Sequence, residues 1–360
     1  AALMALKQQM PLILKKNPQY FYDLRGDQTN SGIIFCPHVN GQLGVAMVAK
    51  HMGHENYFAG KRPNIFQGDA QDWNRFRYRV QRAFKWNVAQ ELVATKSFGM
   101  GIDKPNIRYT IHYVIPQSVE AFYQEAGRAG RNGIENYGLC SILYSDDNWD
   151  TALEVLNEPD HRKALAKLKL IGRDDQGDLL VQLWLMFNSY QGRSEEKRLT
   201  LNFWRDRLAS VILGLPSGST NTQEISFGRG NQDRANTEKA IFRLMLLGVV
   251  EDYTINWQTG HFFVRAKHIS PFEIKDHLRR YLMQYKFEDF ANQTVKDISE
   301  DAVISTLQTA IDVLIDFVYD EIVAKRKQAL LTMGELCRNF NGDQEFRDAI
   351  LAYLQESEFS

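Results

Sequence analysis

Two arginines, Arg128 and Arg131, stand three residues apart in the segment Gln124–Arg131, which reads QEAGRAGR. Residues at this spacing lie on one side of a helical turn, so both guanidinium groups can reach the same ligand. A guanidinium presents a planar fork of donors that matches phosphate oxygens, and it stabilises the charge that develops during phosphoryl transfer. Gln124 adds a hydrogen-bonding amide one turn earlier. The segment therefore indicates a contact with a nucleotide phosphate, and a solvated helix end is the alternative.

A second polar segment, residues 94–105, reads ATKSFGMGIDKP and follows a short apolar run. Glycines such as Gly101 permit backbone angles and close approaches that other residues resist. Thr95 and Ser97 offer hydroxyl groups to a phosphate. Asp103 can accept a hydrogen bond from a hydroxyl or pair with an arginine. The two segments together are a stronger signal than either alone.

Apolar runs alternate with amphipathic helical stretches over the first 148 residues. This alternation predicts an α/β lobe, in which helices cover both faces of a parallel sheet. Because ligands gather at the carboxyl ends of parallel strands, we expect both polar segments to reach the same edge of the sheet. The expected strands are 33–36, 56–59, 91–95, 109–114 and 139–144, and the expected helices are 40–52, 69–86 and 118–126.

These residues resemble superfamily 2 helicases in the form seen in the RecQ family. The stretch ATKSFGMGIDKPNIR at 94–108 resembles motif V, and YQEAGRAGRNG at 123–133 resembles motif VI. SGIIFCPHV at 31–39 is similar to the strand that opens the second RecA-like lobe, and YFAG at 57–60 is similar to the short segment after it.

The resemblance implies a role for each matching residue. Arg128 and Arg131 would be the catalytic pair, reaching the γ-phosphate of ATP across a cleft between two lobes. The implied motor would move 3′ to 5′ along a single strand or partly duplex DNA. The resemblance assigns nucleotide binding to Gln124, Asp103 and Gly101, and contact with the DNA backbone to Thr95 and Ser97.

Half of such a motor is absent from the sequence. Neither a GxxxxGK[ST] loop nor a DExH box occurs in the 360 residues, although phosphoryl transfer requires a phosphate cradle and a Mg²⁺ carboxylate. The resemblance places ATP and Mg²⁺ mainly on a first lobe, so we expect this chain to be part of a longer protein and to be inactive alone. Residues 149–213 contain no cysteine. The family's usual zinc module therefore cannot hold its metal, and we expect no metal site.

The second half of the chain has a different pattern. Residues 215–232 are rich in Gly, Ser, Thr and Asn and are expected to form a loop, after which Asn236 or Thr237 would cap a helix that stops at Gly248. Two β-rich runs then predict a hairpin, and a helix followed by a hairpin is typical of the end of a winged helix. The candidate nucleic-acid contacts of this module are Arg229, Arg234 and Lys239.

The sequence predicts that the chain is organised in five segments. A linker helix and connector precede the second RecA-like lobe. A helical connector without a zinc site, a winged helix and a helical C-terminal region come after it. The winged helix and the helical tail are also candidate surfaces for a protein partner. The expected bounds are 1–30, 31–148, 149–213, 214–268 and 269–360.

Charge and cysteine usage narrow the setting of the protein. The net charge is −1, without the global basic excess of many nucleic-acid binders. Residues 60–85, however, hold seven basic and two acidic residues. A solvated helix face is the favoured interpretation there, and phosphate contact is the alternative. The three cysteines are far apart and predict neither a metal pair nor a disulfide, which favours the cytoplasm. No apolar run has membrane-spanning length.

The leading hypothesis is the second motor lobe and accessory domains of an ATP-dependent DNA helicase. Two alternatives stay open. The chain could be a DNA- or protein-binding adaptor without motor function, or it could belong to an RNA helicase, since fold-level analogy does not separate DNA from RNA.

Overall fold

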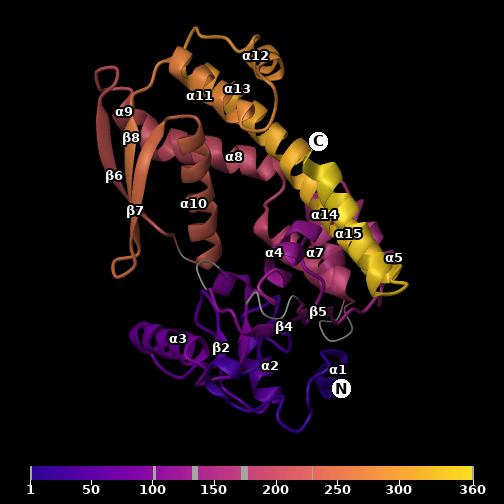
Figure 1. Cartoon of the computed structure of the whole chain (residues 1–360). Coiled ribbons are helices and arrows are strands. Elements are labelled where there is room, and N and C mark those ends of the chain that lie inside the picture. Colours follow the sequence, from indigo (N-terminus) through magenta and orange to yellow (C-terminus); the bar gives the residue numbers. More distant parts are fainter. Residues whose placement is uncertain (1, 100–102, 132–136, 172–176, 229, 359–360) are drawn as a thin grey trace. The chain divides into compact units, whose positions relative to one another are not determined.

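A computed structural model describes residues 2–99, 103–131, 137–171, 177–228 and 230–358. The chain forms two compact units (Figure 1). No helix in the described part of the chain combines the length and the apolar character needed to cross a bilayer. Unit 1 comprises residues 1–159, 163–188 and 326–360, and unit 2 comprises residues 160–162 and 189–325.

A five-stranded parallel sheet forms the centre of unit 1. The strand order is β2–β3–β1–β4–β5, so the first strand lies in the middle and the chain crosses over to reach each neighbour. Strands buried on both faces read as apolar runs, which is why the sequence locates them closely. Their bounds are β1 Ser31–Phe35, β2 Tyr57–Phe58, β3 Glu91–Ala94, β4 Ile107–His112 and β5 Leu139–Ile142.

Side chains that alternate along these strands enter two apolar clusters on opposite faces of the sheet. Ile34 and Val93 belong to one cluster, whereas their neighbours Ile33 and Leu92 belong to the other, together with Phe84 of the long helix α3. This period of two is what a parallel sheet covered on both faces requires. The helices around the sheet are α1 Ala2–Ile13, α2 Val45–His51, α3 Ala70–Lys85 and α4 Val119–Ala126.

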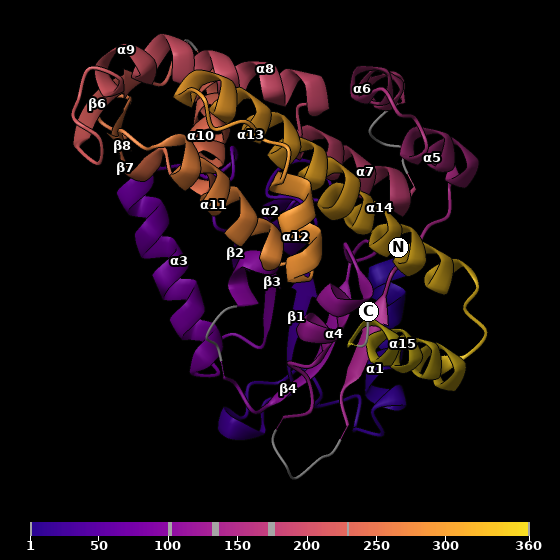
Figure 2. The ribbon, with the colours of Figure 1, turned by 90° about the horizontal axis from the view of Figure 1, so that it is seen from above.

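Helix α3 begins where the sequence predicts. The side chain of Asp69 accepts hydrogen bonds from the backbone N–H groups of Gln71 and Asp72, and the Asp72 carboxylate accepts from the Asp69 N–H. This reciprocal cap satisfies donors that the first helical turn leaves free. Figure 2 shows α3 along the flank of the sheet, beyond the edge strand β2.

Helices from distant parts of the sequence complete unit 1. A third apolar cluster joins Val119 and Phe122 of α4 to residues of five other helices, among them Leu330 and Ile350 near the end of the chain. The last 35 or so residues therefore pack with the lobe, although the sequence places them in one region with residues 269–325. These five helices are α5 Trp149–Leu156, α6 His161–Leu170, α7 Asp178–Ser189, α14 Ala324–Arg338 and α15 Asp343–Glu358.

Unit 2 contains a three-stranded antiparallel sheet and the helix α10 (Asn231–Leu246). The predicted hairpin is confirmed as β7 (Val250–Asn256) and β8 (His261–Lys267). The predicted loop at 215–232 is wrong, because Thr220–Ser226 forms the strand β6 along β8. This edge strand buries only Ile225, so it lacks the apolar alternation by which a strand is recognised.

The predicted start of α10 is also wrong. The helix begins after Gly230, whose backbone is extended and which offers no side-chain cap, rather than at Asn236 or Thr237. Asp233 in the first turn is favourable beside the positive end of the helix dipole. The predicted stop at Gly248 is confirmed, since this glycine has a φ of +76° and its N–H donates to the Met245 carbonyl at 3.0 Å.

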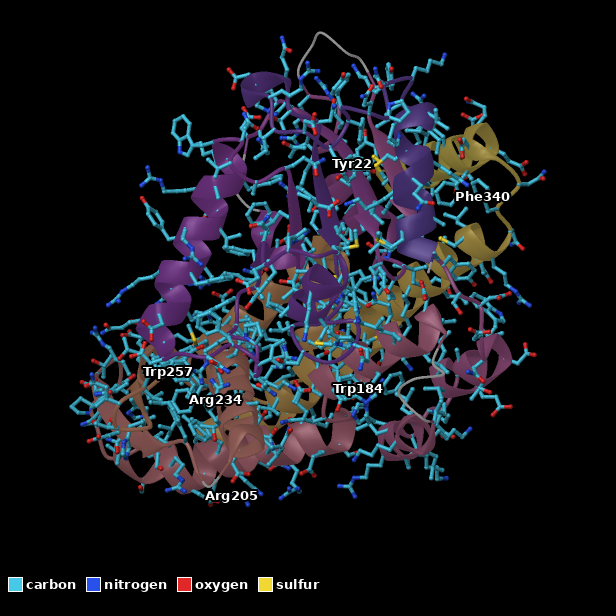
Figure 3. The ribbon with its side chains drawn as sticks, turned by 90° about the horizontal axis from the view of Figure 1, so that it is seen from below. Tyr22, Trp184, Arg205, Arg234, Trp257 and Phe340 are labelled. Atoms are coloured by element: carbon cyan, nitrogen blue, oxygen red, sulfur yellow. The ribbon has the colours of Figure 1, made fainter. Side chains whose placement is uncertain are left out.

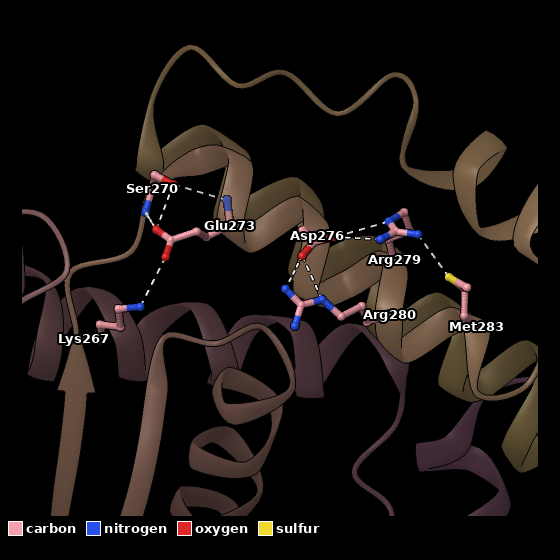
Figure 4. A network of polar contacts seen from close by, with 7 residues as sticks. All are labelled: Lys267, Ser270, Glu273, Asp276, Arg279, Arg280 and Met283. Atoms are coloured by element: carbon pink, nitrogen blue, oxygen red, sulfur yellow. Dashed lines mark hydrogen bonds and ion pairs between the residues drawn. The ribbon is translucent and has the colours of Figure 1, made fainter.

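The rest of unit 2 is helical, as the sequence predicts. Ser270 and Glu273 form a capping box at the start of α11 (Pro271–Met283), and Lys267 pairs with Glu273 at 3.2 Å (Figure 4). The other elements are α8 Arg193–Phe203, the π-helical turn η3 Trp204–Ala209, α9 Ser210–Ile212, α12 Glu288–Val295, α13 Val303–Phe317 and the π-helical turn η4 Val318–Val323.

Candidate functional site

The turn that carries the two arginines is built on α4 and on one glycine. Ser118 caps α4 by accepting from the Ala121 N–H at 3.2 Å. After the helix, Gly130 has a φ of +77° and its N–H donates to the Ile107 carbonyl at 3.0 Å. A positive φ is easily adopted only by glycine. Gly130 therefore fixes the exit of the turn against the first residue of β4.

The two arginines of this turn differ in their surroundings. Arg128 is half-buried, and its Nε is enclosed without a hydrogen-bond partner among the described residues. Burial and the neighbouring charge of Arg131 lower the pKa of Arg128, whereas Glu125 opposes that change. Arg131 is exposed, and its Nε donates to the Gly127 carbonyl at 2.6 Å. Gln124 lies one turn earlier and is exposed.

A buried histidine holds the same helix from the sheet side. His112 Nε2 lies 2.9 Å from Glu125 Oε2, and the His112 ring stacks on Phe35 and meets the edge of Phe122. Nothing in the apolar sequence around His112 predicts this contact. Its only sequence signal is a titratable residue at the end of a buried strand.

The hydroxyl pair lies at the end of β3. Thr95 Oγ1 and Ser97 Oγ are 2.8 Å apart, and the Thr95 N–H donates to the Phe58 carbonyl at 3.1 Å. Gly60 passes beside Ser97, since a Cβ placed on Gly60 would lie 3.5 Å from the Ser97 Cβ. Thr95 is buried at 8% exposure, whereas Ser97 is exposed. The two predicted hydroxyls are thus brought together.

The expectation that both polar segments reach one edge of the sheet is wrong for the hydroxyl pair. Thr95 follows the carboxyl end of β3, whereas Gly130 is bonded to Ile107 at the amino end of β4. The two segments share a face instead, because Phe98 and Ala129 pack in the same apolar cluster. The reason is that α4 is antiparallel to the strand before it and carries the chain back across the sheet.

Another predicted residue of the lobe, Asp103, lies shortly before the amino end of β4. Asp103 is exposed, and among the described contacts no hydrogen bond or ion pair joins it to either arginine. Its neighbour Lys104 is buried, where its ammonium donates to Asn87 Oδ1 and burial lowers its pKa to about 8. Gly101 and Arg229 lie outside the described residues.

Two predicted contacts of unit 2 are already engaged within that unit. Arg234 pairs with Glu238 at 3.5 Å and lies over the ring of the exposed Trp257, 5.0 Å from its centroid (Figure 3). Lys239 donates to the Ser189 carbonyl at 2.5 Å, and burial lowers its pKa. Arg234 remains near the surface, whereas Lys239 serves the packing of α10.

Within the described residues, no cluster of three or more His, Cys, Asp or Glu could hold a metal ion. The arginines and the hydroxyl pair of this lobe are instead donors for anionic oxygens.

Comparison with known proteins decides the family of the lobe. Residues 16–133 match the helicase conserved C-terminal domain. The chain is 41% identical over 117 residues to the RecQ-like DNA helicase blm-1 of Caenorhabditis elegans, covering 32% of this chain and 10% of that protein. It is 31% identical over 179 residues to the ATP-dependent DNA helicase RecQ of Pasteurella multocida, covering 48% and 26%. This chain carries a RecQ-like helicase C-terminal region.

The RecQ helicase of Haemophilus influenzae is similar as well, with 34% identity over 146 residues, 39% of this chain and 22% of that protein. The chain thus spans about a quarter or less of the length of these relatives. The family match covers the hydroxyl pair and the arginine turn and ends at residue 133. All of unit 2 lies beyond residue 133.

Proposed function

We propose that this chain supplies the second motor lobe and accessory domains of an ATP-dependent 3′–5′ DNA helicase. The relatives named above are DNA helicases, and the arginine turn and the hydroxyl pair lie within the matched residues. ATP and Mg²⁺ would be held mainly by a first lobe, because this sequence contains no phosphate-binding loop and no DExH box. Bound ATP supplies the phosphoryl group that is transferred to water.

The observation that carries the proposal is the unpartnered Nε of Arg128. A buried guanidinium nitrogen without a partner is costly, so such a group calls for a ligand that brings an acceptor. A phosphate oxygen is that acceptor, and the guanidinium forms strong charge-assisted bonds with it. Arg131 is exposed beside it and adds a second positive charge. In this proposal Arg128 and Arg131 stabilise negative charge on the γ-phosphate, with Gln124 and Asp103 close to the nucleotide.

The DNA contact of the lobe is assigned to Thr95 and Ser97. The two hydroxyls share one hydrogen bond of 2.8 Å, in which either can be the donor. Each can also turn to donate to a phosphate oxygen of a single strand. The nucleotide end and the DNA end of the lobe then lie toward opposite edges of the sheet, joined by the segment between β3 and β4.

The accessory functions follow from the second half of the chain. Unit 2 would carry a winged helix whose surface arginine Arg234 contacts nucleic acid, and this unit or the helical tail would bind a protein partner. The five-part division at residues 30, 148, 213 and 268 belongs to the same proposal. The dispersed free thiols favour the cytoplasm as its location.

The test is DNA-stimulated ATP hydrolysis by a chain that carries a first lobe ahead of this sequence. Arg131→Ala is expected to lower kcat by about a thousandfold, the range known for arginines of this kind, and to leave DNA binding near normal. Arg205→Ala is the matched control, because this arginine is exposed in unit 2 (Figure 3) and has no assigned role. Normal turnover in Arg131→Ala would overturn the assignment.

Two further measurements separate the alternatives. The 360-residue chain alone is expected to show no ATP hydrolysis with Mg²⁺ and DNA, and turnover by it would contradict the missing-lobe interpretation. Comparing DNA and RNA duplexes as substrates of the longer protein distinguishes a DNA helicase from an RNA helicase. An adaptor without motor function would bind nucleic acid or protein and unwind neither duplex.

A further inference from the structure

We infer that the outer face of α3 is a binding surface for single-stranded nucleic acid, separate from the hydroxyl pair at the end of β3. The inference does not depend on the proposed motor function, because it rests on side chains that neither the arginine turn nor the hydroxyl pair uses. The face is formed by Arg75, Tyr78, Arg79, Arg82, Lys85 and Trp86, all of them exposed.

Helical spacing places these side chains on one side of α3. At 100° per residue they fall within about a third of the helix circumference, opposite the buried Trp73, Val80 and Phe84. Long side chains project from this flank of the lobe into open space (Figure 3). The apolar side of α3 holds the helix on the sheet, so the outer face is presented on a rigid support.

The cations of this face are free to bind an anion. Among the described residues, Arg79, Arg82 and Lys85 make no ion pair, and Arg75 makes only an exposed contact of 3.7 Å with Asp72. Such an exposed pair contributes little. No acidic residue occurs between Asp72 and Glu91. In a chain whose net charge is −1, this concentration of positive charge is local.

Two basic clusters elsewhere in the described residues are neutralised by their neighbours. On α11, Asp276 accepts from both Arg279 and Arg280 (Figure 4). On α8, Lys197 pairs with Asp316 at 2.8 Å and with Asp312 at 3.7 Å. Those arrangements are typical of solvated helix faces. The outer face of α3 lacks that compensation, which favours an anionic ligand over solvent alone.

Two aromatic rings decide which anion fits. Tyr78 is 63% exposed and Trp86 is 66% exposed, so both rings can be covered by a planar ligand. They are eight residues apart, or about 12 Å along the helix axis, and Arg82 lies midway. The Arg82 guanidinium is 5.6 Å from the Tyr78 ring centroid, and Lys85 Nζ is 5.9 Å from that of Trp86.

This order of ring, cation and ring matches the order of base, phosphate and base along a single strand. Proteins that bind single strands without sequence preference combine aromatic platforms with a basic track. An acidic peptide would use the cations but would gain little from two flat, separated rings. A duplex hides the faces of its bases. The alternation therefore favours an unpaired strand bound through stacking and phosphate contacts.

The surface ends near the start of α3. A groove of about 920 Å³ adjoins it there, and Arg75 and Arg79 form part of its wall together with Lys50 of α2. Glu55 and Asp72 also line this groove and would repel a phosphate backbone. The strand is therefore expected to run from Trp86 to Arg75 and to leave the helix there, before Asp72 and Glu55.

The test is fluorescence anisotropy of the 360-residue chain with a labelled oligothymidylate of about twelve nucleotides, within the site sizes known for such proteins. Tyr78→Ala and Trp86→Ala should each weaken binding about tenfold, the loss expected for one base–aromatic stack. Tyr78→Phe keeps the ring and should retain binding. Arg82→Ala should reduce the slope of log affinity against log salt by about 0.7, because one phosphate contact is lost.

Tyr20 and Arg25 give matched controls. The Arg25 guanidinium lies 5.5 Å from the centroid of the exposed Tyr20 ring, and this pair lies outside α3. Tyr20→Ala and Arg25→Ala should bind the oligonucleotide as the unaltered chain does. Wild-type affinity in both Tyr78→Ala and Trp86→Ala, with circular dichroism confirming the fold, would overturn the inference.

Quenching of tryptophan emission tests stacking directly. The oligonucleotide should quench the unaltered chain more strongly than Trp86→Phe. A glutamate homopeptide that binds with equal affinity through Arg82 would overturn nucleic acid as the partner and identify an acidic protein instead. Thr95→Val with Ser97→Ala tests the proposed DNA contact separately. Loss of binding in this double variant but not in the α3 variants would overturn the α3 surface. Loss in the α3 variants alone would count against the hydroxyl pair.

Discussion

His112 of β4 and Glu125 of α4 lie 2.9 Å apart, one buried and the other partly exposed, and they connect the sheet to the helix that carries the arginine turn. Glu125 precedes Arg128 by three residues, and its charge also acts on that arginine. The carboxylate therefore contacts a buried ring on one side and supports a cation on the other. We regard Glu125 as a positioning residue for Arg128.

Glu125→Ala is expected to lower ATP hydrolysis in a chain that carries a first lobe by about tenfold, since a misplaced arginine stabilises the charge of the transferred phosphate less well. It should also lower the free energy of unfolding by about 1–3 kcal/mol, because His112 loses its partner inside the lobe. Glu125→Gln keeps an acceptor oxygen and should therefore retain part of the ATP hydrolysis and part of the stability. Glu335→Gln, at an exposed carboxylate on α14, serves as the control. A drop in unfolding free energy without any loss of turnover would reduce Glu125 to a structural residue.

The sheet could be predicted from the sequence because strands buried on both faces must be apolar, and the order of strands and helices follows from that pattern. The path of the arginine turn could not, since the contact from Gly130 to Ile107 depends on how far α4 returns along the sheet. The strand β6 was missed because an edge strand with one buried residue has the composition of a loop. The His112–Glu125 contact joins residues from two elements and leaves no local signal.

Gly130→Ala tests the backbone of the arginine turn. The substitution forces alanine into a left-handed conformation and places its Cβ 3.1 Å from the Gly138 N and the Tyr137 C. Gly53→Ala imposes a similar conformation, with a φ of +80°, where no atom lies within 4 Å. Urea unfolding should show a loss of about 1–2 kcal/mol for Gly53→Ala and a larger loss for Gly130→Ala.

The difference between the two glycine variants measures the contact itself, because the strain of the left-handed backbone is common to both. Equal losses would mean that residues 137 and 138 move aside without cost. In that case the close contact with residues 137 and 138 would not hold the turn, and Arg131 would keep its position in the variant. Turnover in Gly130→Ala with a first lobe present would then equal that of the unaltered protein.

A buried carboxylate, Glu91, predicts how the stability of the lobe depends on pH. Its oxygens accept from Lys7 at 2.9 Å and from the Tyr109 hydroxyl at 2.7 Å, and His54 Nε2 lies 3.2 Å away. Burial opposes ionisation, but the hydrogen bond from His54 and the charge of Lys7 hold the pKa of Glu91 below its usual value. A lowered pKa contributes stability that is present above the ordinary glutamate value of about 4.3 and is lost as pH falls through the folded-state pKa.

Glu91→Gln should cost about 3–5 kcal/mol at pH 7, because Lys7 loses its charged partner inside the lobe. Measured from pH 7 down to pH 3, the variant should lose less stability than the unaltered chain does. Tyr109→Phe removes one donor and keeps the ring, so a smaller loss of about 1–2 kcal/mol is expected. If acid lowers the stability of both proteins in parallel, Glu91 does not carry this pH dependence.

Asp178, at the start of α7, should give the opposite dependence of stability on pH. Its carboxylate is 6% exposed and accepts from the Ile115 N–H at 2.8 Å, and burial raises its pKa to about 7. Because the folded state binds this proton more tightly than the unfolded state does, its stabilising contribution is complete below about pH 4 and is lost as pH rises to about 7.

Asp178→Asn removes the titrating group and keeps an oxygen that can accept from Ile115. The variant should therefore be more stable than the unaltered chain at pH 8, by at most about 4 kcal/mol for three pKa units, and the difference should shrink toward pH 4. Asp147→Asn, at an exposed neighbour, should leave this pH dependence nearly unchanged. Urea unfolding at pH 4, 6 and 8 measures all three proteins. A variant that is less stable at pH 8 would mean that the folded chain needs the ionised carboxylate, because an asparagine can replace the acceptor but not the charge.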